Sequence, residues 1–98
     1  MNLNAIHNNV EEASSLLKTL ANTSRLQVLC ALATREHTVR ELEVLTGLSQ
    51  PAISQHLARM REEEIVSTRR DAQKIFYSLY KPEVRAILET LHDLYCSD

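Results

Sequence analysis

A single glycine between two stretches of helical periodicity most restricts what this chain can fold into. Apolar residues recur at helical spacing over 39–45 and again over 53–60, and Gly47 is the only glycine in the chain. Glycine adopts the left-handed backbone conformation that ends a helix more readily than any other residue. The segment 38–64 is therefore predicted to form two helices joined by a tight turn.

Capping residues agree with both helices of this pair. Thr38 precedes the first helix, and Glu41 follows three residues later in the capping-box position. Ser49 precedes the second helix, and Pro51 lies in its first turn, where proline is tolerated. The apolar residues expected to face inward are Val39, Leu42, Leu45, Ile53, Leu57 and Met60.

The flanking segments predict three more helices and a hairpin. One helix is expected over 10–21, a second ends near Ala33, and a last begins at Pro82. The segments 65–70 and 74–79 are short and rich in β-branched and aromatic residues, which favours two strands joined by a turn. The predicted fold is mainly α, with five helices and a two-stranded β-hairpin.

Length and composition indicate one globular domain. We assign it to residues 10–98 and treat residues 1–9 as a flexible tail. The amino terminus has neither a basic start nor an apolar run, so a cytoplasmic protein is expected. Neither a CxxC motif nor a glycine-rich phosphate loop is present, and no nucleophile–base arrangement suggests an enzyme. No cofactor is expected.

The charge distribution favours a phosphate-bearing partner despite a net charge of -2. Residues 51–80 carry five basic and four acidic side chains, whereas both flanking parts are net negative. A local basic strip attracts phosphate even on an acidic protein. The basic residues of this part are Arg59, Arg61, Arg69, Arg70 and Lys74.

A helix pair followed by a basic hairpin is the plan of a winged helix-turn-helix, which binds double-stranded DNA. Glutamine pairs with adenine, arginine pairs with guanine, and a helix amino terminus binds phosphate. The hairpin tip is expected along the backbone or in a minor groove. The predicted DNA-binding residues are Ser49, Gln50, Ser54, Gln55, His56, Arg59, Arg69, Arg70 and Lys74. The alternatives are an ordinary helical domain with solvated faces and a winged helix that binds protein.

The segment 39–80 resembles the ArsR family of bacterial repressors. The resemblance rests on the run Leu-Ser-Gln-x-x-x-Ser-Gln-His-Leu over 48–57 and on the hairpin sequence of 69–77, and it extends to residues 16–18 and 25–26. It implies a homodimer formed by the first and last helices, which meets a pseudo-palindromic operator. It also implies repression that an inducer relieves.

The resemblance further bears on the inducer. The family's common metal-binding cysteines are absent from 41–45, and the last helix has only His92 beside Asp93, so no metal ligand set is expected. The chain looks more like the HlyU/BigR branch, which responds to reactive sulfur. This likeness implies that Cys30 and Cys96 approach one another and are joined by persulfides or polysulfides, which lowers DNA affinity. A repressor that senses metal or a general oxidant is the alternative.

Without the resemblance, the sequence predicts different environments for the two cysteines. Cys30 lies on an apolar helix face, where a cysteine is usually a packing residue. Cys96 lies off the apolar stripe of the last helix and close to the end of the chain. His92, four residues earlier, is expected to contact Cys96 and to favour its reactive thiolate form.

Overall fold

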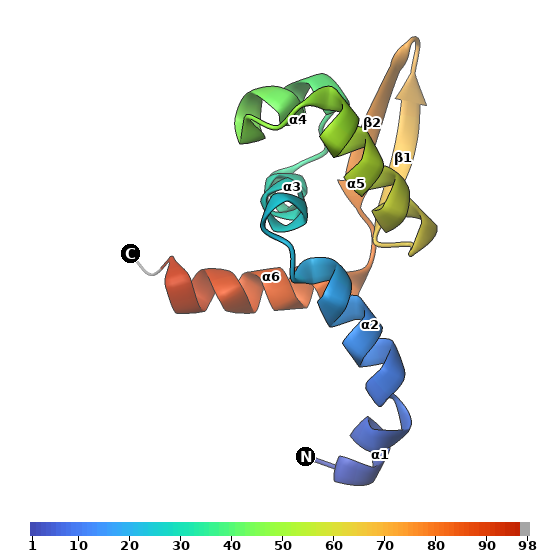
Figure 1. Ribbon diagram of the computed structural model, residues 1–98, viewed down its shortest axis with the longest axis vertical. Helices are drawn as coiled ribbons and strands as arrows, with labels where there is room; N and C mark the ends of the chain where they lie inside the picture. Colours follow the sequence, from blue (N-terminus) through green and yellow to red (C-terminus); the bar gives the residue numbers. More distant parts are fainter. Residues whose placement is uncertain (97–98) are drawn as a thin grey trace.

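The computed structural model describes residues 1–96 and has six helices and one two-stranded antiparallel sheet in that range (Figure 1). The elements in chain order are α1 (Leu3–Asn8), α2 (Val10–Leu20), α3 (Thr23–Thr34), α4 (Val39–Thr46), α5 (Gln50–Glu62), β1 (Val66–Asp71), β2 (Lys74–Leu79) and α6 (Pro82–Tyr95). The predicted winged helix-turn-helix is confirmed. No helix in this range is long and apolar enough to cross a membrane.

One helix more is present than the sequence predicts. Residues 1–9, expected to be a flexible tail, contain α1. The side chain of Asn2 caps this helix by accepting hydrogen bonds from the backbone N–H groups of Asn4 and Ala5. The helix buries none of its residues, so local capping and not a hydrophobic pattern accounts for it. That is why a search for apolar periodicity does not find it.

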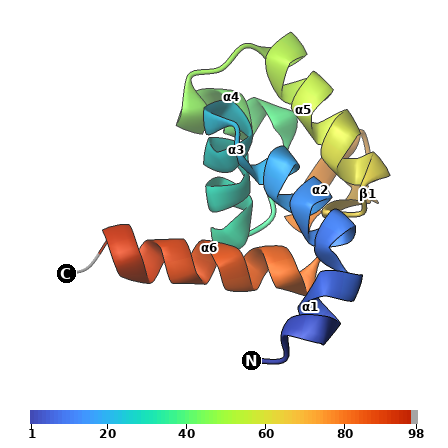
Figure 2. The same ribbon diagram turned by 60° about the horizontal axis from the view of Figure 1, so that its bottom comes forward.

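The core lies around α3, which the other elements surround (Figures 1 and 2). Ile53, Leu57 and Met60 of α5 are fully buried, as predicted, and so is Leu42 of α4. The expectation that Leu45 faces inward is wrong, because its side chain is 60% exposed. The buried apolar residues are Leu20, Val28, Leu29, Leu32, Leu42, Ile53, Leu57, Met60, Ile65, Val66, Val84 and Leu88.

The turn between α4 and α5 has the conformation that the sequence predicts. Gly47 ends α4 with a φ of 74°, in the left-handed region. Thr38 and Glu41 form the capping box at the start of α4, and the Ser49 hydroxyl accepts from the Ala52 N–H at the start of α5. These caps and the turn fix where α5 begins, which is the end of the helix expected to meet DNA.

The hairpin is attached to the helical core on one side. Its register pairs Val66 with Leu79 and Asp71 with Lys74. His37, which precedes α4, exchanges two backbone hydrogen bonds with Tyr77 of β2, of 3.0 and 2.8 Å. Because His37 is also buried, it anchors the hairpin to the helix pair. This anchoring depends on packing between elements far apart in the chain, so the sequence gives no signal of it.

Candidate nucleic-acid interface and thiol pair

The start of α5 and the tip of the hairpin lie toward the same end of the molecule (Figure 1). Gln50 and Gln55 are exposed, and Ser54 is half-buried. The Gln50 side-chain amide donates to the Ser54 hydroxyl over 2.9 Å. The structure thus presents short polar groups at the amino-terminal end of α5, where a recognition helix meets base edges.

All three predicted basic residues of the hairpin are exposed. Arg70 and Lys74 both lie next to the turn of the hairpin. Arg69 is engaged within the protein instead. Its Nε donates to the Glu36 carboxylate over 3.1 Å, and its guanidinium lies 4.6 Å from the centre of the Phe76 ring. These contacts hold Arg69 against the protein, and they involve neither Arg70 nor Lys74.

Arg59 and His56, on the carboxyl-terminal half of α5, lie close to internal charges. Arg59 Nε contacts Glu63 Oε2 over 3.2 Å, and its Nη2 lies 3.4 Å from Thr19 Oγ1. His56 is half-buried, and burial lowers its pKa below the ordinary value, with further lowering by Arg25 and Arg59. His56 is therefore neutral at pH 7, so it adds no charge for phosphate binding.

The lowered pKa of His56 predicts a stability change at mildly acidic pH. The unfolded chain binds a proton near pH 6.5 more readily than the folded protein does, so the free energy of unfolding should fall as pH drops through that value. The His56→Gln variant should lose less stability between pH 7 and pH 5 than the wild type. Urea unfolding at several pH values measures this difference.

A matched variant isolates the effect of that site. His7→Gln changes an exposed histidine of α1 and should leave the pH profile as in the wild type. The carboxyl groups of Glu36 and Glu41 also have lowered pKa values. Their protonation lowers the free energy of unfolding only at pH values below the ordinary pKa of glutamate, which is outside the range from pH 7 to pH 5. Parallel profiles for wild type and His56→Gln from pH 7 to pH 5 would contradict the prediction.

The two cysteines are both free and exposed. The expectation that Cys30 is a packing residue is therefore wrong. Desolvation raises the pKa of the Cys30 thiol, and the negative charge of Cys96 raises it further. Cys30 lies on α3 and Cys96 directly follows α6, and these two helices contact one another.

A side-chain hydrogen bond links α6 to the end of α3. Arg85 Nη1 of α6 donates to the backbone carbonyl of Ala33 at the end of α3 over 3.0 Å. The structure links His92 to Asp93 through its side chain and to Cys96 through the backbone. His92 Nδ1 lies 3.8 Å from Asp93 Oδ1, and the His92 carbonyl accepts from the Cys96 N–H. Within residues 1–96 no three His, Cys, Asp or Glu side chains form a metal-binding group.

Several buried polar contacts could not be predicted from the sequence. Thr19 and Arg25 are buried polar residues next to the α2–α3 junction, and Glu63 faces α2 from the end of α5. Polar residues near helix ends are usually solvated, so the residue types at these positions do not predict burial. Only the packing of α2 against α5 brings them together.

Comparisons with known proteins agree with this geometry. Residues 22–68 match the model of a bacterial regulatory protein family, the arsR family. The chain is 49% identical to the transcriptional activator HlyU of Vibrio cholerae over 98% of its own length and 89% of that protein. A structure of reduced HlyU from the same organism gives a TM-score of 0.89 at 47% identity, covering 97% of this chain and 100% of that one.

Two further structures extend the likeness. The transcriptional repressor BigR from Xylella fastidiosa gives a TM-score of 0.93 at 36% identity, with all of both chains covered. The homodimeric winged helix-turn-helix DNA-binding domain Mb0332 from Mycobacterium bovis gives a TM-score of 0.76 at 25% identity. That match covers 87% of this chain and 79% of that one.

Proposed function

The chain belongs to the ArsR family of bacterial regulatory proteins, and from this premise we propose that it is a homodimeric repressor controlled by a dithiol. It binds operator DNA while Cys30 and Cys96 are reduced, and it releases the operator when reactive sulfur species join them. The observation that carries the proposal is that α3 and α6 contact one another, with one free, exposed thiol on α3 and another directly after α6.

The exposed polar groups at the start of α5 support DNA binding. In this proposal Gln50, Ser54 and Gln55 read base edges in the major groove, because glutamine amides form paired hydrogen bonds with adenine. Ser49 and the helix amino terminus bind a phosphate. Arg70 and Lys74 contact the backbone beside the same site, as exposed cations of the hairpin do in winged helices.

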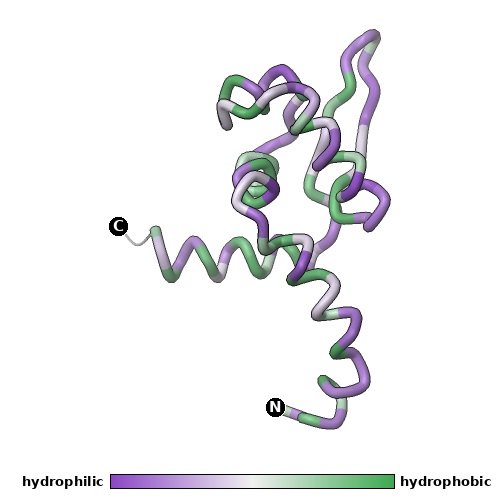
Figure 3. The backbone as a smooth tube through the Cα atoms, viewed as in Figure 1, coloured by the Kyte–Doolittle hydropathy of each residue, from purple (hydrophilic) through white to green (hydrophobic). Residues whose placement is uncertain are grey.

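Exposed apolar side chains on α2 and α6 support the homodimer. Leu17 of α2 is 55% exposed, and Leu94 and Tyr95 of α6 are 67% and 81% exposed. Figure 3 shows apolar residues recurring along both helices, which lie at the end of the molecule away from the hairpin tip. Exposed apolar side chains on these two helices are available for a contact with a second copy of the chain. The homodimeric domain from Mycobacterium bovis is a family relative with the same fold.

The sulfur chemistry is a two-electron oxidation of the dithiol. One thiolate attacks an S–S bond of a polysulfide, which breaks and releases a shorter sulfide, so that the cysteine carries a hydropolysulfide. The second thiolate attacks the penultimate sulfur of that chain, and hydrosulfide leaves with the electron pair. The thiol protons pass to the released sulfides. Cys30 acts second, because its raised pKa disfavours the thiolate.

The bridge joins α3 to the end of α6, and α6 is also part of the proposed dimer surface. A bridged protomer therefore favours a different placement of α6 and, through the dimer, of the paired recognition helices. An inducer acts in this way only if it favours one conformation over another.

Intact mass spectrometry tests the thiol chemistry directly. Reduced protein is treated with polysulfide, and the remaining free thiols are blocked before the mass is measured. The proposal predicts a gain of bridging sulfur within one chain, with both cysteines protected from the blocking reagent. Two blocked, unmodified thiols would contradict it and would return the question of the inducer to metals or small ligands.

A further inference from the structure

A buried threonine joins the end of α2 to the end of α5. Thr19 has no exposed surface, and its hydroxyl donates to Glu63 Oε1 over 2.6 Å. Glu63 is the residue directly after α5, and its backbone N–H bonds back to that helix. Arg59 of α5 contacts both partners, Glu63 over 3.2 Å and the Thr19 hydroxyl over 3.4 Å.

A second arginine completes this group from α3. Arg25 is only 8% exposed, and its Nε donates to the backbone carbonyl of Thr19 over 2.7 Å. Burial lowers the pKa of Arg25, the charge of Arg59 lowers it further, and Glu63 opposes both effects. The Glu63 carboxylate therefore balances two guanidinium groups. We call Thr19, Arg25, Arg59 and Glu63 the Thr19 cluster.

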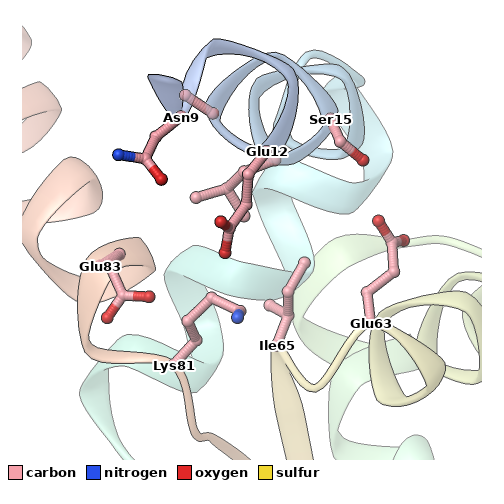
Figure 4. A pocket seen from close by; sticks show the side chains of 9 residues that line it. Asn9, Glu12, Ser15, Glu63, Ile65, Lys81 and Glu83 are labelled. Atoms are coloured by element: carbon pink, nitrogen blue, oxygen red, sulfur yellow. The ribbon is translucent and has the colours of Figure 1, made fainter. Parts of the chain in front are cut away.

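The Thr19 cluster lies beside an open cleft of about 620 Å³. α2, the end of α5 and the start of α6 form its walls, and Figure 4 shows Glu63 pointing toward α2. The cleft separates α2 from the end of α5 on this side, so the two helices are not packed against each other there. Directional hydrogen bonds thus fix the angle between the two helices at this end, because such bonds weaken steeply when their geometry is disturbed.

We propose that the Thr19 cluster is a positioning device that sets the recognition helix α5 against α2. The inference rests on the proposed dimer, in which α2 belongs to the interface. If α2 is fixed by the partner, the cluster determines the distance and angle between the two recognition helices. Thr19 is then a positioning residue that touches no DNA.

This role predicts a selective loss. Operator binding needs both recognition helices at the half-site spacing, whereas non-specific binding depends on phosphate charge. The Thr19→Val variant keeps the shape of the side chain and removes the hydroxyl. It should bind operator about tenfold more weakly, as expected for one lost hydrogen bond, with unchanged affinity for non-specific DNA. A general loss of folded protein would lower both affinities together.

The Thr19→Ser variant separates hydrogen bonding from packing. It keeps the hydroxyl and loses the methyl group, so it should bind operator nearly as the wild type does. Thr34→Val is the matched control, since the exposed Thr34 hydroxyl donates to the Ala31 carbonyl of its own helix, which lies outside the proposed dimer surface. Affinities are measured by fluorescence anisotropy with an operator selected from random duplexes and with a scrambled duplex.

Each outcome decides the inference. Wild-type operator affinity in Thr19→Val, or a larger loss in Thr19→Ser than in Thr19→Val, would overturn it. If Thr19→Val does not fold, Glu63→Gln tests the same cluster, because it removes the charge that pairs with Arg59 and should show the same selective loss. Light scattering on the wild type distinguishes the two proposals. If the wild type is a monomer, the proposed dimer is wrong. If the wild type is a dimer and the variants bind operator as the wild type does, only the proposed role of the Thr19 cluster is wrong.

Discussion

The Leu94→Glu variant should bind operator at least about 100-fold more weakly than the wild type, because a monomer loses the gain from two linked half-site contacts. Leu94 is 67% exposed on α6, so the change leaves the core of the protomer intact. In the proposed dimer the new carboxylate would be buried against apolar surface, which disfavours association strongly. Light scattering and anisotropy titration measure the two effects.

The position of Leu94 also provides a clear control. Val44 of α4 is 76% exposed and lies on an element outside the proposed dimer surface. The Val44→Glu variant should therefore remain dimeric at concentrations at which Leu94→Glu is a monomer. A dimeric Leu94→Glu protein with wild-type operator affinity would show that α6 does not form the interface.

The Cys96→Ser variant should lose the response to polysulfide completely. Allosteric coupling between two sites typically changes an affinity roughly 5- to 150-fold, and we expect a decrease in that range for treated wild-type protein. Without the second thiol no bridge forms between α3 and α6, so the variant should bind operator equally before and after treatment. Because Cys96 is exposed and follows the last helix, its substitution should leave the untreated protein unaffected.

Anisotropy titrations with the same operator check this prediction, and Cys30→Ser should behave as Cys96→Ser does. Thiol blocking after treatment shows whether a single remaining cysteine has reacted. A Cys96→Ser protein that still loses DNA affinity on polysulfide treatment would show that the dithiol mechanism is wrong.

The sequence was sufficient where one local rule determines the structure. Gly47 and the caps at Thr38 and Ser49 marked both ends of α4 and the start of α5, and helical periodicity identified the buried face of α5. The hairpin followed from β-branched and aromatic residues on both sides of a short polar turn. These signals are local in the chain, so they can be interpreted without knowing how the elements pack.

Properties that depend on packing between distant elements could not be predicted. Leu45 and Cys30 lie on apolar stripes in the sequence, yet both are exposed beside a cavity of about 500 Å³ between α3 and α4. The hydrogen bond from Arg69 to Glu36 joins residues 33 positions apart in the chain, which no local pattern indicates. The Thr19 cluster likewise needs the crossing of α2 and α5, which no spacing in the sequence specifies.

The central claim is that a sulfur bridge between Cys30 and Cys96 lowers operator affinity. The most direct test is an operator titration of wild-type protein whose single-chain bridge has been verified by intact mass, repeated after the bridge is reduced with a dithiol. The account predicts weak binding by the bridged protein and full recovery of affinity after reduction. Equal affinities for the bridged and reduced forms would contradict it.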